Sequence, residues 1–191
     1  NFLTKRRINF LIHLAAISSV ENADLNRLET YKKNILGLEK SIQIAKKTKC
    51  QSFIFTSSAA VYGNTSNLPI KETNIKDPCS FYGFSKHVNE TQIEFYSKEL
   101  NINFFILRLF NIYGGKNSLL YNNGVISKWI GNIITNKKII LDNKGKCTRD
   151  YVYIDDLFKI MSNLLSRKKK KLSIYNVGTG KPISLSKLLK I

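Results

Sequence analysis

Short apolar runs alternate with amphipathic stretches along the first half of the chain. Residues 8–14, 52–55 and 103–109 are apolar along nearly their whole length, which predicts strands that are buried on both faces. In residues 24–47 and 84–100, apolar side chains recur at three- and four-residue spacing, which predicts helices. Strands that alternate with helices in this order predict an α/β fold with a parallel sheet covered on both faces.

The second half of the chain predicts shorter elements after the glycine pair at residues 114–115. In order, these are a helix at 125–135, a strand at 139–141, a turn at 143–145, a strand at 151–153, a helix ending near Leu165 and a strand at 173–177. Either Asp155 or Asp156 is suited to cap the second of these helices, and Ser184 to cap a final one.

The residues that end three of the predicted strands are rich in small or polar side chains. They lie at positions 15–18, 56–58 and 110–111. In an open parallel sheet, ligands bind beside the carboxyl ends of the strands. We therefore expect a binding site at this end of the sheet.

The composition is that of a globular protein. The chain has 191 residues, of which 43% are hydrophobic, so it can bury a core. It has no run of eighteen apolar residues, which argues against a membrane partner. Its start has neither a signal-peptide run nor an initiator methionine, so we expect it to begin mid-protein. Three scattered cysteines and two histidines argue against a disulfide framework or a metal site and for a cytoplasmic setting.

The formal net charge of +18 has two interpretations. Lysine clusters such as the one at residues 167–171 can bind nucleic acid, which leaves a non-catalytic basic binding module as an alternative function. However, aromatic residues do not interleave with these lysines, as stacking on single strands requires. The cluster also closes a predicted helix, where cations are favourable. We therefore attribute the charge to lysine-rich solvated surfaces and expect no nucleic-acid partner.

Tyr82 and Lys86 form the sharpest chemical pattern in the sequence. They lie four residues apart at the start of a predicted helix, so they share one face. A phenol loses its proton near pH 10, and a neighbouring ammonium lowers that pKa, which makes tyrosine a usable base. A serine hydroxyl at a strand end, such as that of Ser58, can hydrogen-bond the reacting oxygen. The spacing alone is common, so the wider context has to support it.

Ordered motifs over nearly the whole chain provide that context. They lie at residues 13–16 (HLAA), 34–37 (NILG), 55–63 (FTSSAAVYG), 78–86 (PCSFYGFSK), 108–114 (RLFNIYG), 148–156 (TRDYVYIDD) and 175–180 (YNVGTG). The series resembles the extended short-chain dehydrogenase/reductase family, in its nucleotide-sugar epimerase and dehydratase branch. The resemblance implies a partial Rossmann-like, doubly wound parallel sheet with a small, incomplete substrate-binding subdomain.

The resemblance also implies roles for particular residues. Tyr82 is expected to be the catalytic acid and base, assisted by the cationic nicotinamide ring. Lys86 is its partner and a ligand of the nicotinamide ribose, and Ser58 completes the triad. Each of the three also contacts cofactor or substrate. The implied NAD-lining residues are Leu14, Ala15, Ala16 and Phe110, and the implied sugar-nucleotide ligands are Asn111 and Arg149.

Three of the residues near these motifs have alternative roles. The forked cation of Arg149 suits a diphosphate, although a surface salt bridge with Asp150 or Asp155 is the alternative. His13 could act as a general base, but at the end of a predicted strand a packing role is favoured. Cys79 has no paired histidine motif nearby and is expected to be a bystander.

The pair of residues after Ser58 indicates the branch of the family. Residues 59–60 are both alanine, where dehydratases of the family have an Asp–Glu pair and decarboxylating relatives keep a glutamate. Alanine cannot transfer the additional proton that elimination of water needs. The resemblance therefore favours removal of a hydride and its return to the other face, at carbon 4 of a UDP-hexose or a similar nucleotide sugar. A 4,6-dehydratase or a ketoreductase remains the alternative.

The glycine-rich G-x-x-G-x-x-G loop of the family, which receives the cofactor pyrophosphate at a helix N-terminus, does not occur in this sequence. Residues 178–180 also lie between a strand and a helix, but they lack a third glycine and match a different motif. We therefore reject them as a cofactor loop. We expect a truncated fragment or a degraded copy that holds NAD weakly, exposes a sheet edge, is poorly soluble and is inactive by itself.

The resemblance divides the chain between two domains. Residues 1–112 and 151–178 are expected to be the C-terminal part of the NAD-binding domain. Residues 113–150 and 179–191 are expected to be part of the substrate-binding subdomain. Relatives commonly dimerise through helices like the one at residues 84–100, so the full-length parent is expected to be a homodimer.

Overall fold

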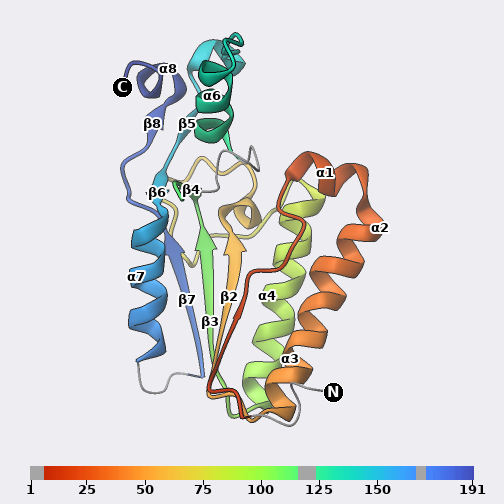
Figure 1. The fold of residues 1–191 in the computed structure, drawn as a ribbon. Helices are drawn as coiled ribbons and strands as arrows, with labels where there is room; N and C mark the ends of the chain where they lie inside the picture. Colours follow the sequence, from red (N-terminus) through yellow and green to blue (C-terminus); the bar gives the residue numbers. More distant parts are fainter. Residues whose placement is uncertain (1–6, 116–123, 167–170) are drawn as a thin grey trace. The chain divides into compact units, whose positions relative to one another are not determined.

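The computed structural model describes residues 7–115, 124–166 and 171–191 (Figure 1). The chain divides into two compact units. The first unit consists of residues 1–109 and 161–176, and the second of residues 110–160 and 177–191.

Four strands form one sheet among the described residues, in the order β1-β2-β3-β7. They are β1 (Phe10–His13), β2 (Ser52–Ser58), β3 (Asn103–Leu109) and β7 (Leu172–Val177). β1 pairs in parallel with β2, and β2 pairs in parallel with β3. The N–H of Phe104 donates to the carbonyl of Lys171, and the N–H of Phe110 to that of Val177. β7 therefore runs in the same direction as β3, as the arrows in Figure 1 indicate.

Helices α3 (Gly37–Lys47) and α4 (Phe81–Glu99) pack against the sheet and form the core of the first unit with it (Figure 1). The fully buried side chains of this core include Leu38, Ile42, Ala45, Phe53, Phe55, Ile93, Phe104 and Ile106. Burial of one large apolar side chain contributes about 1.5–3 kcal/mol. The predicted α/β fold, a parallel sheet with flanking helices, is confirmed.

β2 continues beyond the predicted strand, whereas β3 spans the predicted residues. Thr56 and Ser57 are buried, and Ser58 still pairs with Leu109 in the ladder. Their polar groups do not end the strand because they find partners. The hydroxyl of Thr56 donates to the carbonyl of His13 at 3.2 Å, and that of Ser57 donates to a carboxylate at 2.6 Å.

The helix predicted at residues 24–47 consists of several segments. They are α1 (Val20–Leu25), α2 (Arg27–Thr30), the π-helical segment η2 (Tyr31–Leu36) and α3. Asn26, at φ −121° and ψ 56°, separates α1 from α2. Its side-chain amide donates to the side-chain oxygen of Asn22 at 2.7 Å, a local bond that competes with the helical pattern. In α2, Leu28 is 68% exposed, although the three- and four-residue spacing of apolar residues at 24–47 includes it.

α4 begins at Phe81 rather than at the predicted residue 84. The hydroxyl of Ser80 accepts the N–H of Gly83 at 3.1 Å, and the carboxylate of Asp24 accepts the N–H of Phe81 at 2.6 Å. These bonds satisfy two of the N–H groups that a helix start leaves unpaired. Tyr82 therefore lies within the first turn of α4.

The second unit contains two short strand pairs in its described part. β4 (Asn111–Tyr113) pairs in parallel with β6 (Tyr151–Tyr153), and β5 (Thr148–Arg149) pairs antiparallel with β8 (Ile183–Ser184). Its helical segments are α6 (Val125–Ile134), the 3₁₀ turn η4 (Asp142–Gly145), α8 (Leu185–Leu188) and the first part of α7 (Ile154–Leu165).

The strand predicted at residues 139–141 is wrong. These residues form neither helix nor strand, and Ile140 is 80% exposed. Within the described part of the chain they have no ladder partner. An apolar run alone therefore did not define a strand here, because a strand also requires a neighbouring chain to accept its backbone hydrogen bonds.

The two predicted helix caps have different outcomes. Ser184 caps α8, as predicted, by accepting the N–H of Lys187 at 3.2 Å. α7 begins at Ile154, so Asp155 and Asp156 lie within its first turn instead of capping it. Acidic residues at that position still stabilise the helix, because they lie near the positive end of the helix dipole.

β1 is an end strand of the sheet within the described residues. Its residues Phe10 and Ile12 are 43% and 41% exposed. An exposed sheet edge was expected, and the low solubility that follows from it stays a prediction.

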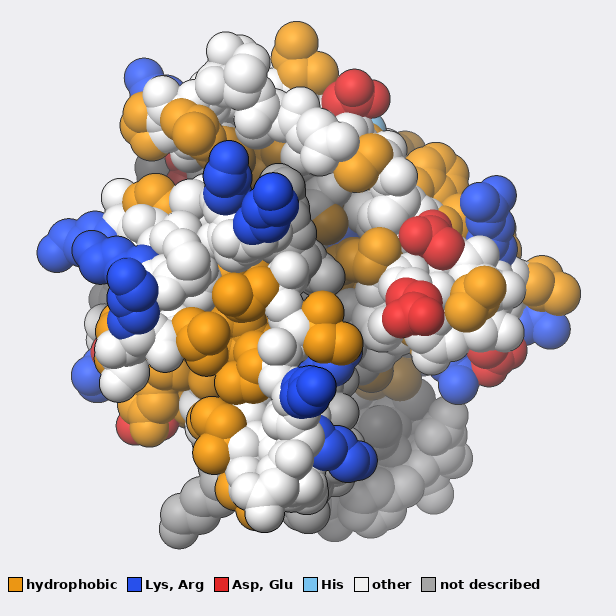
Figure 2. Space-filling model, turned by 90° about the horizontal axis from the view of Figure 1, so that it is seen from above, with side chains coloured by type: hydrophobic (Ala, Val, Ile, Leu, Met, Phe, Trp, Pro, Cys, Tyr) orange, Lys and Arg blue, Asp and Glu red, His pale blue; other side chains and the backbone are white. Residues whose placement is uncertain are grey.

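The surface carries its positive charge in separate groups on the face drawn in Figure 2. Hydrophobic and uncharged side chains lie between the lysine and arginine groups on this face. The basic cluster noted in the sequence lies, at residues 167–170, outside the described residues. None of the described helices has the length and apolarity that a membrane crossing requires.

Candidate active site

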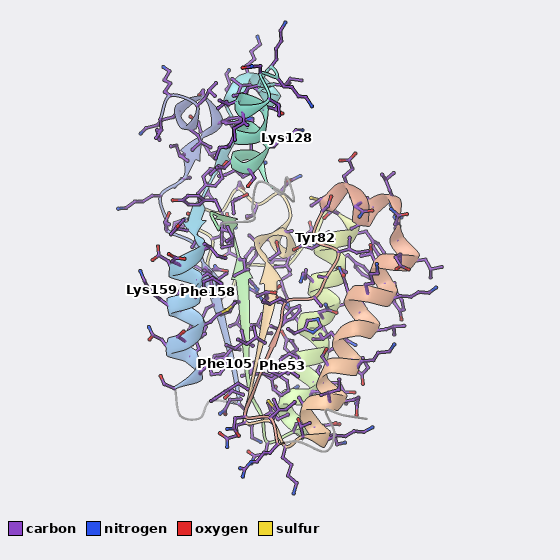
Figure 3. The ribbon with its side chains drawn as sticks, in the orientation of Figure 1. Phe53, Tyr82, Phe105, Lys128, Phe158 and Lys159 are labelled. Atoms are coloured by element: carbon purple, nitrogen blue, oxygen red, sulfur yellow. The ribbon has the colours of Figure 1, made fainter. Side chains whose placement is uncertain are left out.

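Ser58, Tyr82 and Lys86 come together where the end of β2 meets the start of α4. The side chain of Ser58 lies close enough to the phenol of Tyr82 to lower its pKa. The Nζ of Lys86 lies over the ring of Tyr82, 5.8 Å from its centroid. In Figure 3, Tyr82 lies beside the carboxyl end of β2, whereas Phe53 lies toward the opposite end of the sheet. The structure therefore brings the three expected side chains together at the end of the sheet that the sequence indicated.

A close contact between α4 and the short 3₁₀ helix η3 (Ala59–Tyr62) fixes this arrangement. A Cβ at Gly83 would lie only 2.5 Å from the carbonyl oxygen of Ala60, so the position has no room for a side chain. The hydroxyl of Ser58 also accepts the N–H of Ala60, at 3.2 Å. The alanine pair thus shapes the site through its backbone.

Lys86 is a buried ammonium, with 3% of the residue exposed. Its Nζ donates to the carbonyl of Thr56 at 2.7 Å and lies 4.8 Å from the centroid of the Phe55 ring. Burial lowers the pKa of Lys86 from 10.5 to about 8, and the charge of Glu90 acts in the opposite direction. Among the hydrogen bonds of the described residues, this ammonium has Thr56 as its one acceptor, although it carries three N–H donors.

The pKa of Tyr82 is raised above its ordinary value of 10. Burial of the phenol is the main cause, and the hydrogen bond with Ser58 acts in the opposite direction. Lys86 is not among the causes of this shift, and the expectation that the ammonium and a nicotinamide ring together lower the pKa of Tyr82 stays a prediction. For the phenol without a cofactor, the loss of water around the phenolate outweighs the effect of Ser58. A second positive charge at the site is needed to reverse the direction.

Glu90 and Arg108 form a buried ion pair one helical turn beyond Lys86. Their exposed fractions are 0% and 2%, and the guanidinium donates to both carboxylate oxygens, at 2.8 and 3.0 Å. The hydroxyl of Ser57 donates to the same carboxylate at 2.6 Å. This pair was not predicted from the sequence. The available signal was the recurrence of Tyr82, Lys86 and Glu90 at four-residue spacing on one helix face.

Arg108 also fixes the segment that connects η3 to α4. Its Nη1 donates to the hydroxyl of Tyr62 at 2.6 Å and to the carbonyl of Glu72 at 2.8 Å. The Tyr62 hydroxyl in turn donates to the side-chain oxygen of Asn176 at 2.6 Å. A buried guanidinium with this many acceptors is well satisfied, which makes the network a rigid support for the neighbouring site.

Asn34, which is fully buried in η2, holds the segment after β1. Its side-chain oxygen accepts the N–H of Ile17 at 2.8 Å, and its amide donates to the hydroxyl of Ser85 at 3.0 Å. This segment is thereby tied to α4. The predicted cofactor-lining residues that it contains are Leu14, Ala15 and Ala16, of which the first two are exposed and the last is half-buried.

His13 is the last residue of β1, and its side chain is buried against aromatic residues of the core. Its Nδ1 lies 2.9 Å from the hydroxyl of Ser41, and its ring lies 6.3 and 6.0 Å from the ring centroids of Phe53 and Phe55. Burial, followed by the charge of Lys86, lowers the pKa of His13 from 6.5 to about 4. It is therefore neutral near pH 7 and packs in the core.

In the second unit, Asp150 organises the turn at residues 178–180. Its carboxylate accepts the N–H of Thr179 at 2.9 Å, the hydroxyl of Thr179 at 2.5 Å and the N–H of Gly180 at 2.8 Å. Its backbone carbonyl accepts both the main-chain N–H and the side-chain amide of Asn111, at 3.0 and 3.1 Å. The N–H groups of Thr179 and Gly180 thus both donate hydrogen bonds to Asp150.

The other predicted binding residues of the second unit are Phe110 and Arg149. A Cβ at Gly178 would lie 3.4 Å from the ring of Phe110, so this ring packs beside the turn. Arg149 is exposed and donates to the carbonyl of the preceding residue at 2.8 Å. No ion pair of the described residues includes Arg149, so the alternative of a salt bridge with Asp150 or Asp155 is not observed there.

The groups of the first unit fit one half of a nicotinamide dinucleotide. The ammonium of Lys86 has donors to spare, and Ser58 and Tyr82 present hydroxyls at the same place. A positively charged nicotinamide ring also supplies the charge that the phenol lacks. The other half of the dinucleotide has no glycine-rich loop within this sequence. The residues of this chain would therefore hold the nicotinamide end.

Comparison with known proteins identifies the family. Residues 1–178 match the NAD dependent epimerase/dehydratase family. A putative UDP-glucose 4-epimerase of Methanocaldococcus jannaschii is 36% identical over 97% of this chain and 62% of that protein. A dTDP-D-glucose 4,6-dehydratase of Dictyostelium discoideum is 33% identical over 96% of this chain and 44% of that protein.

Solved structures agree with the sequence match. UDP-N-acetylglucosamine 4-epimerase from Methanobrevibacter ruminantium M1 superimposes with a TM-score of 0.91 at 26% identity, over 100% of this chain and 62% of that one. UDP-glucose 4-epimerase from Thermotoga maritima gives a TM-score of 0.89 at 30% identity, over 99% of this chain and 61% of that one. The chain thus spans less than two thirds of these relatives. By both sequence and fold, it belongs to the NAD-dependent epimerase/dehydratase family.

Proposed function

We propose that the full-length protein is an NAD-dependent epimerase of a nucleotide sugar, of the UDP-hexose 4-epimerase type. The observation that carries this proposal is the proximity of Ser58 to the phenol of Tyr82, together with the ammonium of Lys86 at 5.8 Å from the centroid of the phenol ring. The three groups offer a proton acceptor, a ligand for a reacting oxygen and a positive charge at one point. Similarity to two 4-epimerases solved with UDP-linked ligands supports the substrate class.

In the proposed reaction, the hydroxyl oxygen of Tyr82 takes the proton from the sugar hydroxyl at carbon 4, while Ser58 hydrogen-bonds the same sugar oxygen. NAD, when bound, supplies the acceptor and then the donor of the hydride. Lys86 stabilises the phenolate and holds the nicotinamide ribose. The 4-keto sugar turns between the two transfers, and Tyr82 returns the proton after the hydride has reached the opposite face.

The remaining site residues divide between cofactor and substrate in this proposal. Leu14, Ala15, Ala16 and Phe110 line NAD. Asn111 and Arg149 hold the sugar nucleotide, since an exposed guanidinium can pair with a diphosphate through two parallel hydrogen bonds. The assignment of residues 1–112 and 151–178 to the cofactor domain and of residues 113–150 and 179–191 to the substrate domain is part of the same proposal.

Substitution of Tyr82 by phenylalanine in the full-length parent tests this function. Loss of the phenol oxygen removes the acid and base, so the turnover number should fall by about 100- to 10,000-fold. Chromatography measures the conversion of UDP-glucose to its epimer. Tyr96→Phe is the matched control, because Tyr96 lies on the same helix and bonds Glu39 at 2.8 Å, away from the triad. Wild-type turnover in Tyr82→Phe would refute the proposed role.

A dehydratase or ketoreductase of nucleotide sugars is the second candidate. The Dictyostelium dehydratase at 33% identity favours it, as does a dTDP-4-dehydro-6-deoxyglucose reductase of Escherichia coli at 30% identity. Against a dehydratase, the alanines at residues 59–60 carry no group that can transfer a proton. Incubation of the full-length parent with UDP-glucose distinguishes the reactions: an epimerase yields the epimer without an ultraviolet-absorbing keto product, whereas a dehydratase accumulates that product.

Three further properties belong to this proposal. The full-length parent is a homodimer, which sedimentation velocity measures. The protein is cytoplasmic, in keeping with free thiols at Cys50, Cys79 and Cys147. The 191-residue chain by itself holds NAD weakly and is inactive, which titration of the chain with NAD by calorimetry tests.

A further inference from the structure

Three residues of α4, each one helical turn after the last, interact with three consecutive residues at the end of β2, the second and third of them through hydrogen bonds. The pairs are Tyr82 with the hydroxyl of Ser58, Lys86 with the carbonyl of Thr56 at 2.7 Å, and Glu90 with the hydroxyl of Ser57 at 2.6 Å. The proposed function uses the first two pairs only. The third pair brings a fully buried carboxylate onto the same helix face.

The carboxylate of Glu90 is ionised in this environment. Burial alone would raise the pKa of Glu90, but hydrogen bonds from Arg108 and Ser57, with the charges of Arg108 and Lys76, lower it below 4.5. The Nζ of Lys76 lies 3.4 Å from the carboxylate. Glu90 therefore carries a negative charge at every pH at which the proposed reaction would run.

Lys86 depends on that charge because burial disfavours an ammonium. The titratable groups that face it are Tyr82 and Glu90 on α4 and His13 on β1, while Arg108 on β3 and Lys76 in the connecting segment act through Glu90. His13 is neutral near pH 7, and in the absence of cofactor the phenol of Tyr82 is protonated and uncharged. Among the charges that act on Lys86 within the described residues, Glu90 is the carboxylate that opposes desolvation.

We propose that Glu90 is a positioning residue that keeps Lys86 in its charged form, and through Lys86 supports the base Tyr82. The inference rests on the proposed function of the Tyr82 and Lys86 pair. It adds that the buried ion pair of Glu90 and Arg108 is an electrostatic part of the site as well as a structural one. The carboxylate touches neither substrate nor cofactor in this scheme and acts through one side chain.

The titration of Lys86 tests this role directly, without NAD or substrate. The 191-residue chain is labelled with ¹³C at the lysine ε carbon, and the signal of Lys86 is assigned by its absence from the spectrum of Lys86→Arg. We expect a midpoint near pH 8 in the wild type. In Glu90→Gln the midpoint should fall by about one pH unit, a tenfold decrease in the ratio of charged to neutral Lys86.

Glu94→Gln is the matched control, since Glu94 lies one turn further along α4 and also binds Lys76 at 3.4 Å, but at 38% side-chain exposure. Its substitution should leave the Lys86 midpoint unchanged. If Glu90→Gln does not fold, Lys76→Met provides the reciprocal test. Removal of that cation leaves more of the Glu90 charge to act on Lys86, so the midpoint should rise.

An unchanged midpoint in Glu90→Gln, or equal shifts in Glu90→Gln and Glu94→Gln, overturns the inference. With Lys76→Met alone, a midpoint that stays the same or falls overturns it. These outcomes are separate from the proposed function, which stands or falls on the turnover of Tyr82→Phe.

Discussion

Arg108 in the first unit and Arg149 in the second have opposite environments. In the first unit, Arg108 is 2% exposed and donates to Glu90, to Tyr62 and to a backbone carbonyl. In the second unit, Arg149 is exposed and bonds the carbonyl of the residue before it. The guanidinium of Arg108 thus bonds to several groups within the protein, whereas that of Arg149 is exposed and can still bond to a ligand.

This difference suggests that the two arginines have different roles. Groups that exchange protons must have a fixed geometry and a controlled charge, which a buried, fully bonded network provides. A group that binds a flexible diphosphate can stay solvated until the ligand arrives, since an exposed guanidinium has a small desolvation penalty before binding. Under the proposed function, we expect stability to depend more on Arg108 and substrate affinity more on Arg149.

The largest expected effect is that of Arg108→Met. The substitution leaves the Glu90 carboxylate buried without its main partner, so the free energy of unfolding should fall by about 3–5 kcal/mol. Urea unfolding followed by circular dichroism measures it. Arg149→Met is the matched variant: it should change stability by less than about 0.5 kcal/mol while weakening nucleotide-sugar binding in the full-length parent. Equal destabilisation by both substitutions would contradict the comparison.

A smaller decrease in the free energy of unfolding is expected from Gly83→Ala. The new Cβ would lie 2.5 Å from the carbonyl oxygen of Ala60, so the start of α4 has to move away from η3. We expect a loss of stability of about 1–3 kcal/mol, together with reduced turnover, because Tyr82 moves with the helix. Gly37→Ala is the control, since its nearest contact would be 3.9 Å, and it should be neutral or slightly stabilising. A thermal unfolding midpoint that Gly83→Ala leaves unchanged would argue against a rigid contact.

The smallest effect is a pH dependence of stability that arises from His13. Its pKa is about 4 in the folded chain and 6.5 in the unfolded one, so the unfolded state takes up a proton first as the pH falls. The stability that comes from keeping His13 neutral is therefore fully present above pH 6.5 and is lost progressively between pH 6.5 and 4. Between about pH 7.5 and 5.5 the loss should be about 1 kcal/mol. His13→Asn should remove most of this slope in urea titrations, and a slope that persists would assign it to other groups.

The fold was largely predictable because each element of the sheet has its own local signal. The run at residues 103–109 is apolar and bounded by polar residues, and β3 has those bounds. The helix predicted at residues 24–47 was misjudged at Asn26, where a side-chain bond to Asn22 replaces the helical pattern. The strand predicted at residues 139–141 failed because pairing depends on a partner that periodicity cannot reveal.

The candidate site was predictable in its members but not in its electrostatics. The motifs indicated Ser58, Tyr82 and Lys86, and the structure brings them together. Sequence patterns do not indicate that burial raises the pKa of Tyr82, because desolvation depends on the atoms packed around the phenol. For the same reason Glu90 and Arg108 were missed, since their separation in sequence does not suggest a bond.

By itself, the sequence determined the order of strands and helices, the spacing that puts Tyr82 and Lys86 on one helix face, and the family that these motifs represent. Local periodicity and short motifs are properties of neighbouring residues, so they can be read along the chain. The tertiary structure decided which charges are buried, which carboxylate faces Lys86, and that Asp150 holds the turn at residues 178–180. Those outcomes depend on the distance between residues far apart in sequence and on the water excluded between them, which only the folded chain defines.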